Sequence, residues 1–164
     1  MTLEEFLQIG RTVVIGAHRL ETGEILHFAR KYDPQLFHTD EEAARKSVLG
    51  GLCASGWHTC ALWMKYNVAA GFGEAEWQGE GPAPIFGPSP GFRDLRWLKP
   101  AYAGDTLTFA RQSIGFRPLT SRPGWYVLNG LATADNQEGE RVMSFESAVL
   151  FHHARHEEKA QSPS

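Results

Sequence analysis

The chain has 164 residues, a length that fits one domain with a substantial core, and its 42% hydrophobic content excludes the disordered class. The formal net charge of −3 and the sequence pI of about 6.2 give no basic surface of the kind that nucleic-acid binding requires. The N-terminal "MTLEEFLQIG" is acidic, and no run approaches the ~18 apolar residues of a membrane span, so we expect a cytoplasmic protein without a signal peptide.

The first part of the chain is predicted to be rich in short helices. A strand is expected at about residues 12–19, followed by a helix over residues 22–32 with Thr22 as its N-cap. Pro34 should end that helix, because proline disfavours the helical conformation in the residue before it. The carboxylate of Asp40 is expected to cap a second short helix in "EEAARKS".

The longest helix is predicted at about residues 55–70, in "ASGWHTCALWMKYNVAAG". Its side chains are apolar nearly all round, which is typical of a helix buried on every face. Gly71 is a natural stop signal after it. The two cysteines, Cys53 and Cys60, are expected on one face of this helix as free, packed thiols, since two are too few for a disulfide framework or a four-ligand zinc site.

Residues 71–91 are rich in glycine and proline, so we expect a long loop with no regular structure, of a length that is often functional. Four alternating, β-rich segments follow, at about residues 92–98, 105–116, 124–135 and 141–153. This order predicts an α+β fold in which a curled antiparallel sheet wraps around one long central helix. We expect a single domain over residues 1–154 and a polar C-terminal tail over residues 155–164.

The segment "YDPQLFHTD" places a histidine between two aspartates. His38 has the side chain best suited to proton transfer near neutral pH, and a turn could bring Asp33 beside it, so that both contact one water molecule. In the alternative interpretation, Asp33 is a residue at a helix end and His38 is a structural histidine. The spacing alone leaves both open. Asp40 is interpreted only as a helix cap.

A second candidate site is "GGLCASGWHT", at the start of the long helix. The Gly56 N–H could stabilise negative charge on a thioester oxygen. Ser55 is a candidate substrate-binding residue beside it, but the role of N-cap is the preferred interpretation. His58 is interpreted as a packed histidine. His38 and Asp40 also match the H-x-D part of a non-haem iron site, with His152 or His153 as a third ligand, but so short a match is common by chance and no metal site is predicted.

Two segments resemble a known family. "FARKYDPQLFHTDEEAARKSVLGGLCASGWHTCALWM", residues 28–64, resembles the hydratase motif of the MaoC-like dehydratases, which include the (R)-specific enoyl-CoA hydratases. "LRWLKPAYAGDTLTF", residues 95–109, resembles a later strand–turn–strand signature of the same family. The spacing from aspartate to histidine, the H-x-D and the "ASG" before the long helix all fall in register.

The resemblance implies a hotdog fold and a homodimer or higher homo-oligomer with its active site near the subunit interface. It implies that Asp33 and His38 are the catalytic dyad, and that the backbone N–H of Gly56, next to Ser55, faces the thioester oxygen. Gln35-Leu36 replaces the usual Asn-Pro, Ser55 replaces a histidine, and Met64 replaces a hydroxyl residue of some members. These departures concern the substrate rather than the dyad.

The expected activity is that of a lyase, the reversible hydration of a trans-2-enoyl thioester to a 3-hydroxyacyl thioester. The substrate is expected to be an acyl-CoA, with coenzyme A as part of the substrate and with no metal or redox cofactor. Two alternatives remain, an acyl-CoA thioesterase with the same fold and an acyl-CoA-binding protein without catalytic activity. The sequence specifies neither the length of the acyl chain nor the role of residues 71–91.

Overall fold

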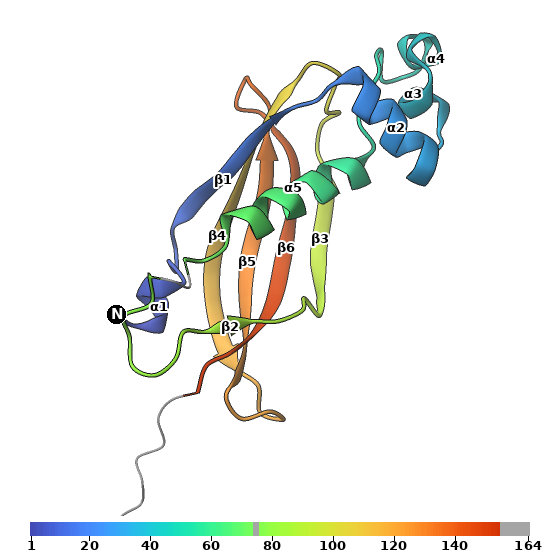
Figure 1. The fold of residues 1–164 in the computed structure, drawn as a ribbon. Helices are drawn as coiled ribbons and strands as arrows, with labels where there is room; N and C mark the ends of the chain where they lie inside the picture. The colour runs from blue at the N-terminus through green and yellow to red at the C-terminus, as the bar shows by residue number, and fades with distance from the viewer. Residues whose placement is uncertain (74–75, 155–164) are drawn as a thin grey trace, which may run out of the picture.

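The computed structural model describes residues 1–73 and 76–154, which form a curled antiparallel sheet with one long helix against it (Figure 1). The helices are α1 (Leu3–Phe6), α2 (Thr22–Tyr32), α3 (Leu36–Thr39), α4 (Glu41–Lys46) and α5 (Gly56–Ala70). The strands are β1 (Thr12–Arg19), β2 (Ile85–Phe86), β3 (Gly91–Trp97), β4 (Thr106–Pro118), β5 (Trp125–Asp135) and β6 (Arg141–His152). The predicted tail, residues 155–164, lies outside the described residues. Among the described helices, none combines the length and hydropathy needed to cross a bilayer.

The sheet has the strand order β1-β4-β5-β6-β2, and β3 pairs with β6 beside β2. All of these pairs are antiparallel, and β4, β5 and β6 follow one another as a meander. The five predicted strands are confirmed. However, β3 and β4 are not neighbours, because the chain leaves β3 at one edge and crosses to the far side of β5. The turn that makes this crossing is closed by Asp105, whose Oδ2 accepts from the Tyr102 N–H over 2.8 Å.

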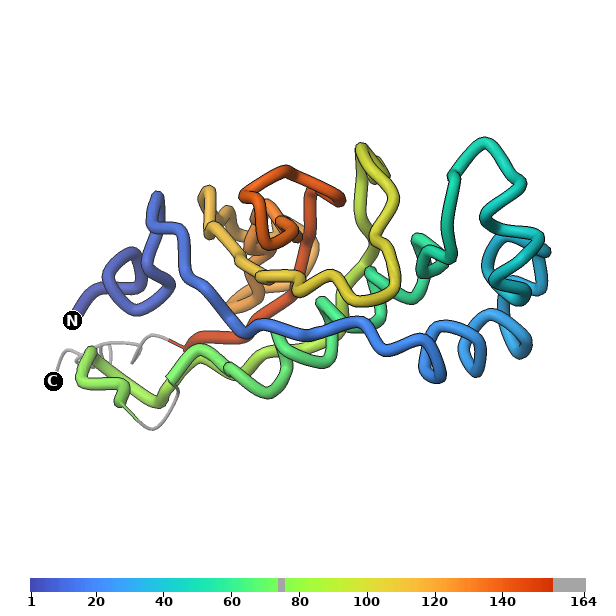
Figure 2. The backbone as a smooth tube through the Cα atoms, turned by 90° about the horizontal axis from the view of Figure 1, so that it is seen from above, coloured from blue at the N-terminus to red at the C-terminus, as the bar shows by residue number. Residues whose placement is uncertain are grey.

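Helices α2, α3 and α4 extend beyond one end of the sheet, while α1 lies at the opposite end (Figure 1, Figure 2). The prediction of Thr22 as N-cap is wrong, because Glu21 is the N-cap and Thr22 is the first residue of the helix. The Glu21 N–H donates to Glu24 Oε1 over 3.1 Å, and this contact stabilises the first turn. The predicted cap at Asp40 is confirmed, since its Oδ1 accepts from the Ala43 N–H at 2.8 Å. The single turn of α3 was not predicted.

Helix α5 begins after Ser55, which caps it by accepting from the Trp57 N–H, as one of the two interpretations of Ser55 held. The prediction that α5 is buried on every face is wrong. Trp57, Met64 and Val68 are 51%, 46% and 71% exposed, because the open sheet covers only one side of the helix. The covered side is anchored by Trp63, whose indole N–H donates to the Ala110 carbonyl of β4 over 2.9 Å.

Two further predictions need correction. Cys53 does not share a helix face with Cys60, because it lies before α5 in an extended segment that bridges to Tyr102. Residues 71–91 are not entirely irregular, since β2 within them pairs with β6 and places Phe86 opposite Phe151. Phe151 is fully buried in a cluster with Leu3, Phe6, Leu7 and Leu128, so the loop and α1 close the same end of the molecule.

Candidate functional site

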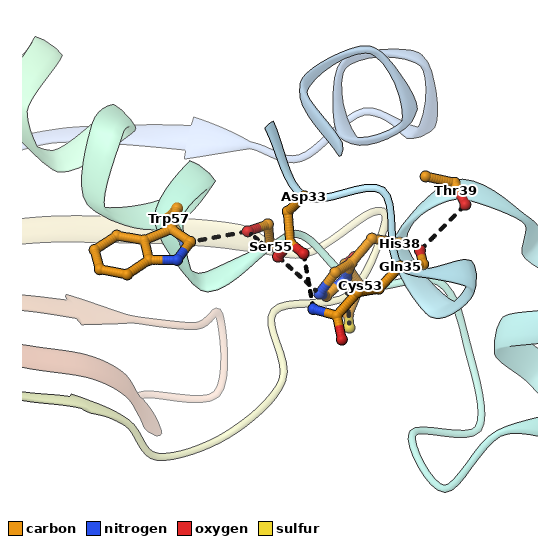
Figure 3. Close-up of polar contacts among 7 residues, drawn as sticks. All are labelled: Asp33, Gln35, His38, Thr39, Cys53, Ser55 and Trp57. Atoms are coloured by element: carbon orange, nitrogen blue, oxygen red, sulfur yellow. Dashed lines mark hydrogen bonds and ion pairs between the residues drawn. The ribbon is translucent and has the colours of Figure 1, made fainter. Parts of the chain in front are cut away.

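Asp33 is the residue at which α2 ends. Its N–H donates to the Ala29 carbonyl over 2.9 Å, and its backbone then turns out of the helix with φ −151° and ψ 69°. Pro34 follows and prevents the helix from continuing, as predicted. The end of α2 therefore fixes the position of this carboxylate, which is turned toward the start of α5 (Figure 3).

His38 lies in α3 and is 7% exposed. Its Nδ1 is 2.7 Å from the backbone carbonyl of Cys53, and because a carbonyl only accepts, Nδ1 carries the proton. In the neutral ring, the lone pair then lies on Nε2, which faces Asp33 Oδ2 at 3.6 Å (Figure 3). The structure thus brings Asp33 and His38 together, and the gap between them is longer than a direct hydrogen bond.

Two side chains hold the Asp33 carboxylate. The hydroxyl of Ser55 donates to Oδ2 over 2.7 Å, and the amide of Gln35 donates to Oδ1 over 2.7 Å. Burial raises the pKa of Asp33, but the hydrogen bonds from Ser55 and Gln35 and the nearby charge of His38 outweigh it and bring the pKa below its ordinary value. The carboxylate is therefore ionised near neutral pH. In the sequence, Gln35 is recognisable only as a departure from the family pattern, and its contact with Asp33 was not predicted.

Gly56 is the first residue of α5, so its N–H is one of those that an α-helix leaves without an intrahelical partner. A Cβ atom at this position would lie 2.2 Å from Cε2 of Trp97, so only glycine fits against this indole. Trp97 comes from the end of β3 and also packs edge-to-face on Trp57, with ring centroids 5.1 Å apart. No local sequence signal identifies Trp97 as a neighbour of Gly56.

Cys53 contributes to the site through its backbone as well as its side chain. Its carbonyl orients the His38 ring, and its Sγ is 3.6 Å from His38 Nδ1. Burial, together with the negative charge of Asp33, raises the pKa of the Cys53 thiol to about 11. The thiol is therefore neutral at physiological pH, and it forms part of the wall around His38.

The other candidate residues lie outside this group. Asp40 caps α4, and His58 stacks on Phe28 with ring centroids 4.5 Å apart, as expected of a packed histidine. His153 is buried against Trp77. In residues 1–73 and 76–154, no three or more His, Cys, Asp or Glu side chains are grouped so as to hold a metal ion.

A cavity of about 470 Å³ lies between α5 and the inner face of the sheet. Trp57, next to Gly56 in the chain, lines one end, and Phe72 and Phe86 line it beyond the last turn of α5. Neither Asp33 nor His38 is among the lining residues, so the dyad lies outside the cavity. Among the helix residues that line the cavity, Trp57 lies nearest to the start of α5.

Comparisons with known proteins agree with this architecture. A family model described as "MaoC like domain" matches residues 7–123. An uncharacterised protein, YdeM from Bacillus subtilis (strain 168), is 30% identical over 150 residues, which cover 92% of this chain and 98% of that protein. The crystal structure of a MaoC-like dehydratase from Rhodospirillum rubrum is 34% identical, has a TM-score of 0.76, and is matched over 94% of this chain and 98% of its own.

The fold also extends to more distant structures. The (R)-hydratase from A. caviae involved in PHA biosynthesis is 16% identical and has a TM-score of 0.60, with 86% of this chain and 94% of that chain covered. At that identity, the likeness supports the fold alone. The family model spans most of the chain, and the relatives at 30% and 34% identity align over nearly their whole length. The chain has a hotdog fold and belongs to the MaoC-like dehydratase family.

Proposed function

We propose that this protein is a hydro-lyase that reversibly hydrates a trans-2-enoyl thioester to a 3-hydroxyacyl thioester. The observation that carries the proposal is the pair formed by Asp33 and His38, with Oδ2 and Nε2 3.6 Å apart. The carboxylate is held ionised, and the imidazole presents a lone pair to the same point. Membership of a dehydratase family supports the addition or removal of water as the general chemistry.

In the proposed reaction, a water molecule held by Asp33 and His38 supplies the hydroxyl group and the proton that add across the double bond. Its oxygen attacks C3, the dyad takes the proton that this oxygen loses, and a proton returns to C2. Positioned acid–base groups of this kind typically accelerate a reaction by about 10² to 10⁴. The dehydration direction uses the same groups in reverse.

Negative charge that develops on the thioester oxygen needs a donor, and the Gly56 N–H at the start of α5 is the proposed one. The positive end of the helix dipole adds to the same effect. Loss of one oxyanion donor typically costs about 10² to 10³ in rate. The proposed mechanism uses no metal or redox cofactor, and coenzyme A enters as the thiol part of the substrate.

We also propose that the protein acts as a homodimer or a larger homo-oligomer. The outer edge of β3 lies open in the described part of the chain, and such an edge is a template for pairing with another strand. Phe92 and Trp97 of this strand are 55% and 47% exposed, which leaves large apolar surface beside the site. Light scattering on the purified protein measures the assembly, and a monomeric mass contradicts this proposal.

The test is an assay with trans-2-enoyl-CoAs that follows the loss of the conjugated thioester absorbance. Asp33→Asn and His38→Ala are expected to lower kcat by about 10² to 10⁴, and the matched control Asp40→Asn is expected to retain turnover. Near-normal turnover in Asp33→Asn contradicts the dyad. Release of free thiol from acyl-CoA indicates a thioesterase instead, and saturable acyl-CoA binding with no turnover indicates a binding protein.

A further inference from the structure

The cavity follows one face of α5. Trp57, Cys60, Met64, Asn67 and Val68 all line it, and these positions recur every three or four residues along the helix. From Trp57 to Val68 the lining residues span about 16 Å of the helix, at about 1.5 Å per residue. An elongated space of 470 Å³ fits a flexible chain better than a compact group.

One lining residue of the cavity, Trp57, is the chain neighbour of the proposed oxyanion donor, although Gly56 itself does not line the cavity. Trp57 follows Gly56 directly in the chain, so a substrate whose thioester oxygen faces the Gly56 N–H has its acyl group beside Trp57. The edge-to-face pair of Trp57 with Trp97 flanks this passage. Trp97 is 47% exposed, and Met64 and Val68, farther along the cavity, are 46% and 71% exposed, so the helix side of the cavity is open while the sheet forms its opposite wall.

Most of the lining surface is apolar. Leu95, Phe145, Leu128 and Val149 form much of the wall on the sheet side. Arg111 is the one charged side chain among the described lining residues, and its guanidinium already donates to Asn67 Oδ1 and to the Gly71 carbonyl. An acyl group that carries its own charge would therefore be poorly solvated along most of this space.

Two phenylalanines from the glycine- and proline-rich segment after α5 line the cavity beyond the last turn of the helix. Phe72 and Phe86 stack with ring centroids 4.2 Å apart and an interplanar angle of 13°. Phe86 is fixed in turn by the pairing of β2 with β6, and the next residue, Gly87, donates from its N–H to the Leu150 carbonyl over 2.7 Å. The stacked pair is thus a wall held by the sheet.

We infer that Phe72 and Phe86 set the chain-length limit of the substrate, which is an unbranched apolar acyl thioester whose tail lies along α5. This inference rests on the proposed function, and it gives the segment over residues 71–91 a role. Each methylene that enters an apolar cavity contributes about fourfold in kcat/KM, from ~0.8 kcal/mol per buried CH₂. The gain should stop at the length at which the chain meets the Phe72–Phe86 pair.

The test is a series of straight-chain trans-2-enoyl-CoAs from crotonyl-CoA through octenoyl-CoA to hexadecenoyl-CoA. In the wild type, kcat/KM is expected to rise about fourfold per methylene and then to fall for chains that exceed the cavity. Phe86→Ala, or Phe86→Leu if the alanine variant does not fold, should move the optimum to longer chains. Val149→Phe fills the cavity from β6 and should move it to shorter chains.

Ile85→Ala is the matched control, because Ile85 shares the two-residue strand with Phe86 but is 65% exposed and does not line the cavity. Its chain-length profile should equal that of the wild type. A flat profile overturns the inference, as does an optimum that neither cavity substitution moves. A preference for acyl groups with a terminal carboxylate also overturns it.

Binding separates this inference from the proposed function. The affinities of saturated acyl-CoAs, measured by calorimetry, should follow the same chain-length order in the wild type and shift in the same directions in the variants. If no enoyl-CoA is hydrated but this binding pattern is found, the hydratase assignment fails and the cavity assignment stands. If hydration occurs but neither binding nor turnover depends on chain length, the cavity assignment is wrong and the hydratase assignment stands.

Discussion

The hydroxyl of Ser55 donates to Oδ2 of Asp33 over 2.7 Å, and that oxygen is also the one that faces the His38 ring. Ser55 is fully buried and also caps α5 by accepting from the Trp57 N–H over 3.3 Å. One side chain therefore joins the proposed base to the helix that carries the proposed oxyanion donor. Its removal should affect proton transfer and helix stability through separate contacts.

Ser55→Ala should raise the pKa of Asp33, because it removes a hydrogen bond that stabilises the ionised carboxylate. The ionised form is then lost at a higher pH, so the acidic limb of the pH profile of kcat/KM should move upward. The same substitution removes an N-cap and should lower the free energy of unfolding by about 1 kcal/mol. Ser55→Thr, which keeps a hydroxyl, should restore both properties at least in part.

A matched control separates the two effects of Ser55→Ala. Asp40→Ala also removes an N-cap, that of α4, and should cost a similar ~1 kcal/mol of stability. Asp40 has no contact with Asp33 among the hydrogen bonds of the site. The pH profile of kcat/KM, corrected for the fraction of folded protein, should therefore be the same in Asp40→Ala as in the wild type. An equal shift of the acidic limb in both variants would show that loss of a cap, and not the bond to Asp33, is the cause.

Gly56→Ala should be strongly destabilising, because the added Cβ would meet the Trp97 ring at 2.2 Å. Overpacking of this kind costs about 1 to 3 kcal/mol, and any movement of the ring or helix start should also reduce turnover. The double variant Gly56→Ala/Trp97→Ala removes the clash and should recover stability relative to Gly56→Ala. Chemical denaturation measures both, and no recovery in the double variant would show that steric contact with Trp97 is not the cause.

The stability of the fold should fall as the pH drops below about 6.5, in part because of His58. Burial lowers the pKa of His58; the negative charge of Glu24 opposes this in part, and the positive charge of His18 adds a smaller lowering effect. Between the lowered folded pKa and the ordinary unfolded value, the unfolded state binds more protons, so protonation favours unfolding. The melting temperature should therefore decrease from about pH 7.5 to about pH 5.5.

His58→Leu should reduce this pH dependence, because leucine has no proton to bind in either state. His27→Leu is the control, since His27 is exposed on α2 and its substitution should leave the slope of melting temperature against pH as in the wild type. Part of the slope is expected to remain in His58→Leu through other titrating groups. A slope identical to that of the wild type in His58→Leu contradicts the assignment.

The two thiols should be unreactive in the native protein at neutral pH. Burial raises the pKa of Cys60 as well as that of Cys53, so little thiolate is present at either position. A disulfide reagent should label the native protein slowly and label both cysteines at once after denaturation. Rapid labelling of native Cys53 would show that the region around His38 opens frequently.

The parts of the fold that follow from local patterns were predicted from the sequence. The alternation of apolar and polar residues predicted the positions of β1 and of β4 to β6, and the long apolar segment predicted the bounds of α5 almost to the residue. The placement of β3 was not predictable in this way, because strand order depends on pairing between distant segments. Burial of α5 was overestimated because side-chain hydropathy does not reveal that the sheet leaves one face of a helix open.

The same distinction applies to the site. The spacing of Asp33 and His38 in one short segment left open whether they lie side by side, and the family resemblance implied that they do; the structure places them 3.6 Å apart. The Cys53 carbonyl that orients His38 is a backbone group, which no residue type marks in a sequence. Trp97 is distant in the chain from Gly56, and only the folded sheet brings them into contact. Their catalytic roles stay predictions until the variants are assayed.

The residues that hold the dyad and the residues that enclose the cavity come from different parts of the chain. Asp33, His38, Cys53 and Ser55 all lie within one stretch of fewer than 30 residues, whereas the far wall of the cavity is built by the segment after α5 and by β6. Changes in that segment can alter the cavity without moving the dyad. Selection can therefore diversify the substrate range of such a protein by loop mutation or loop length, at little risk to its chemistry.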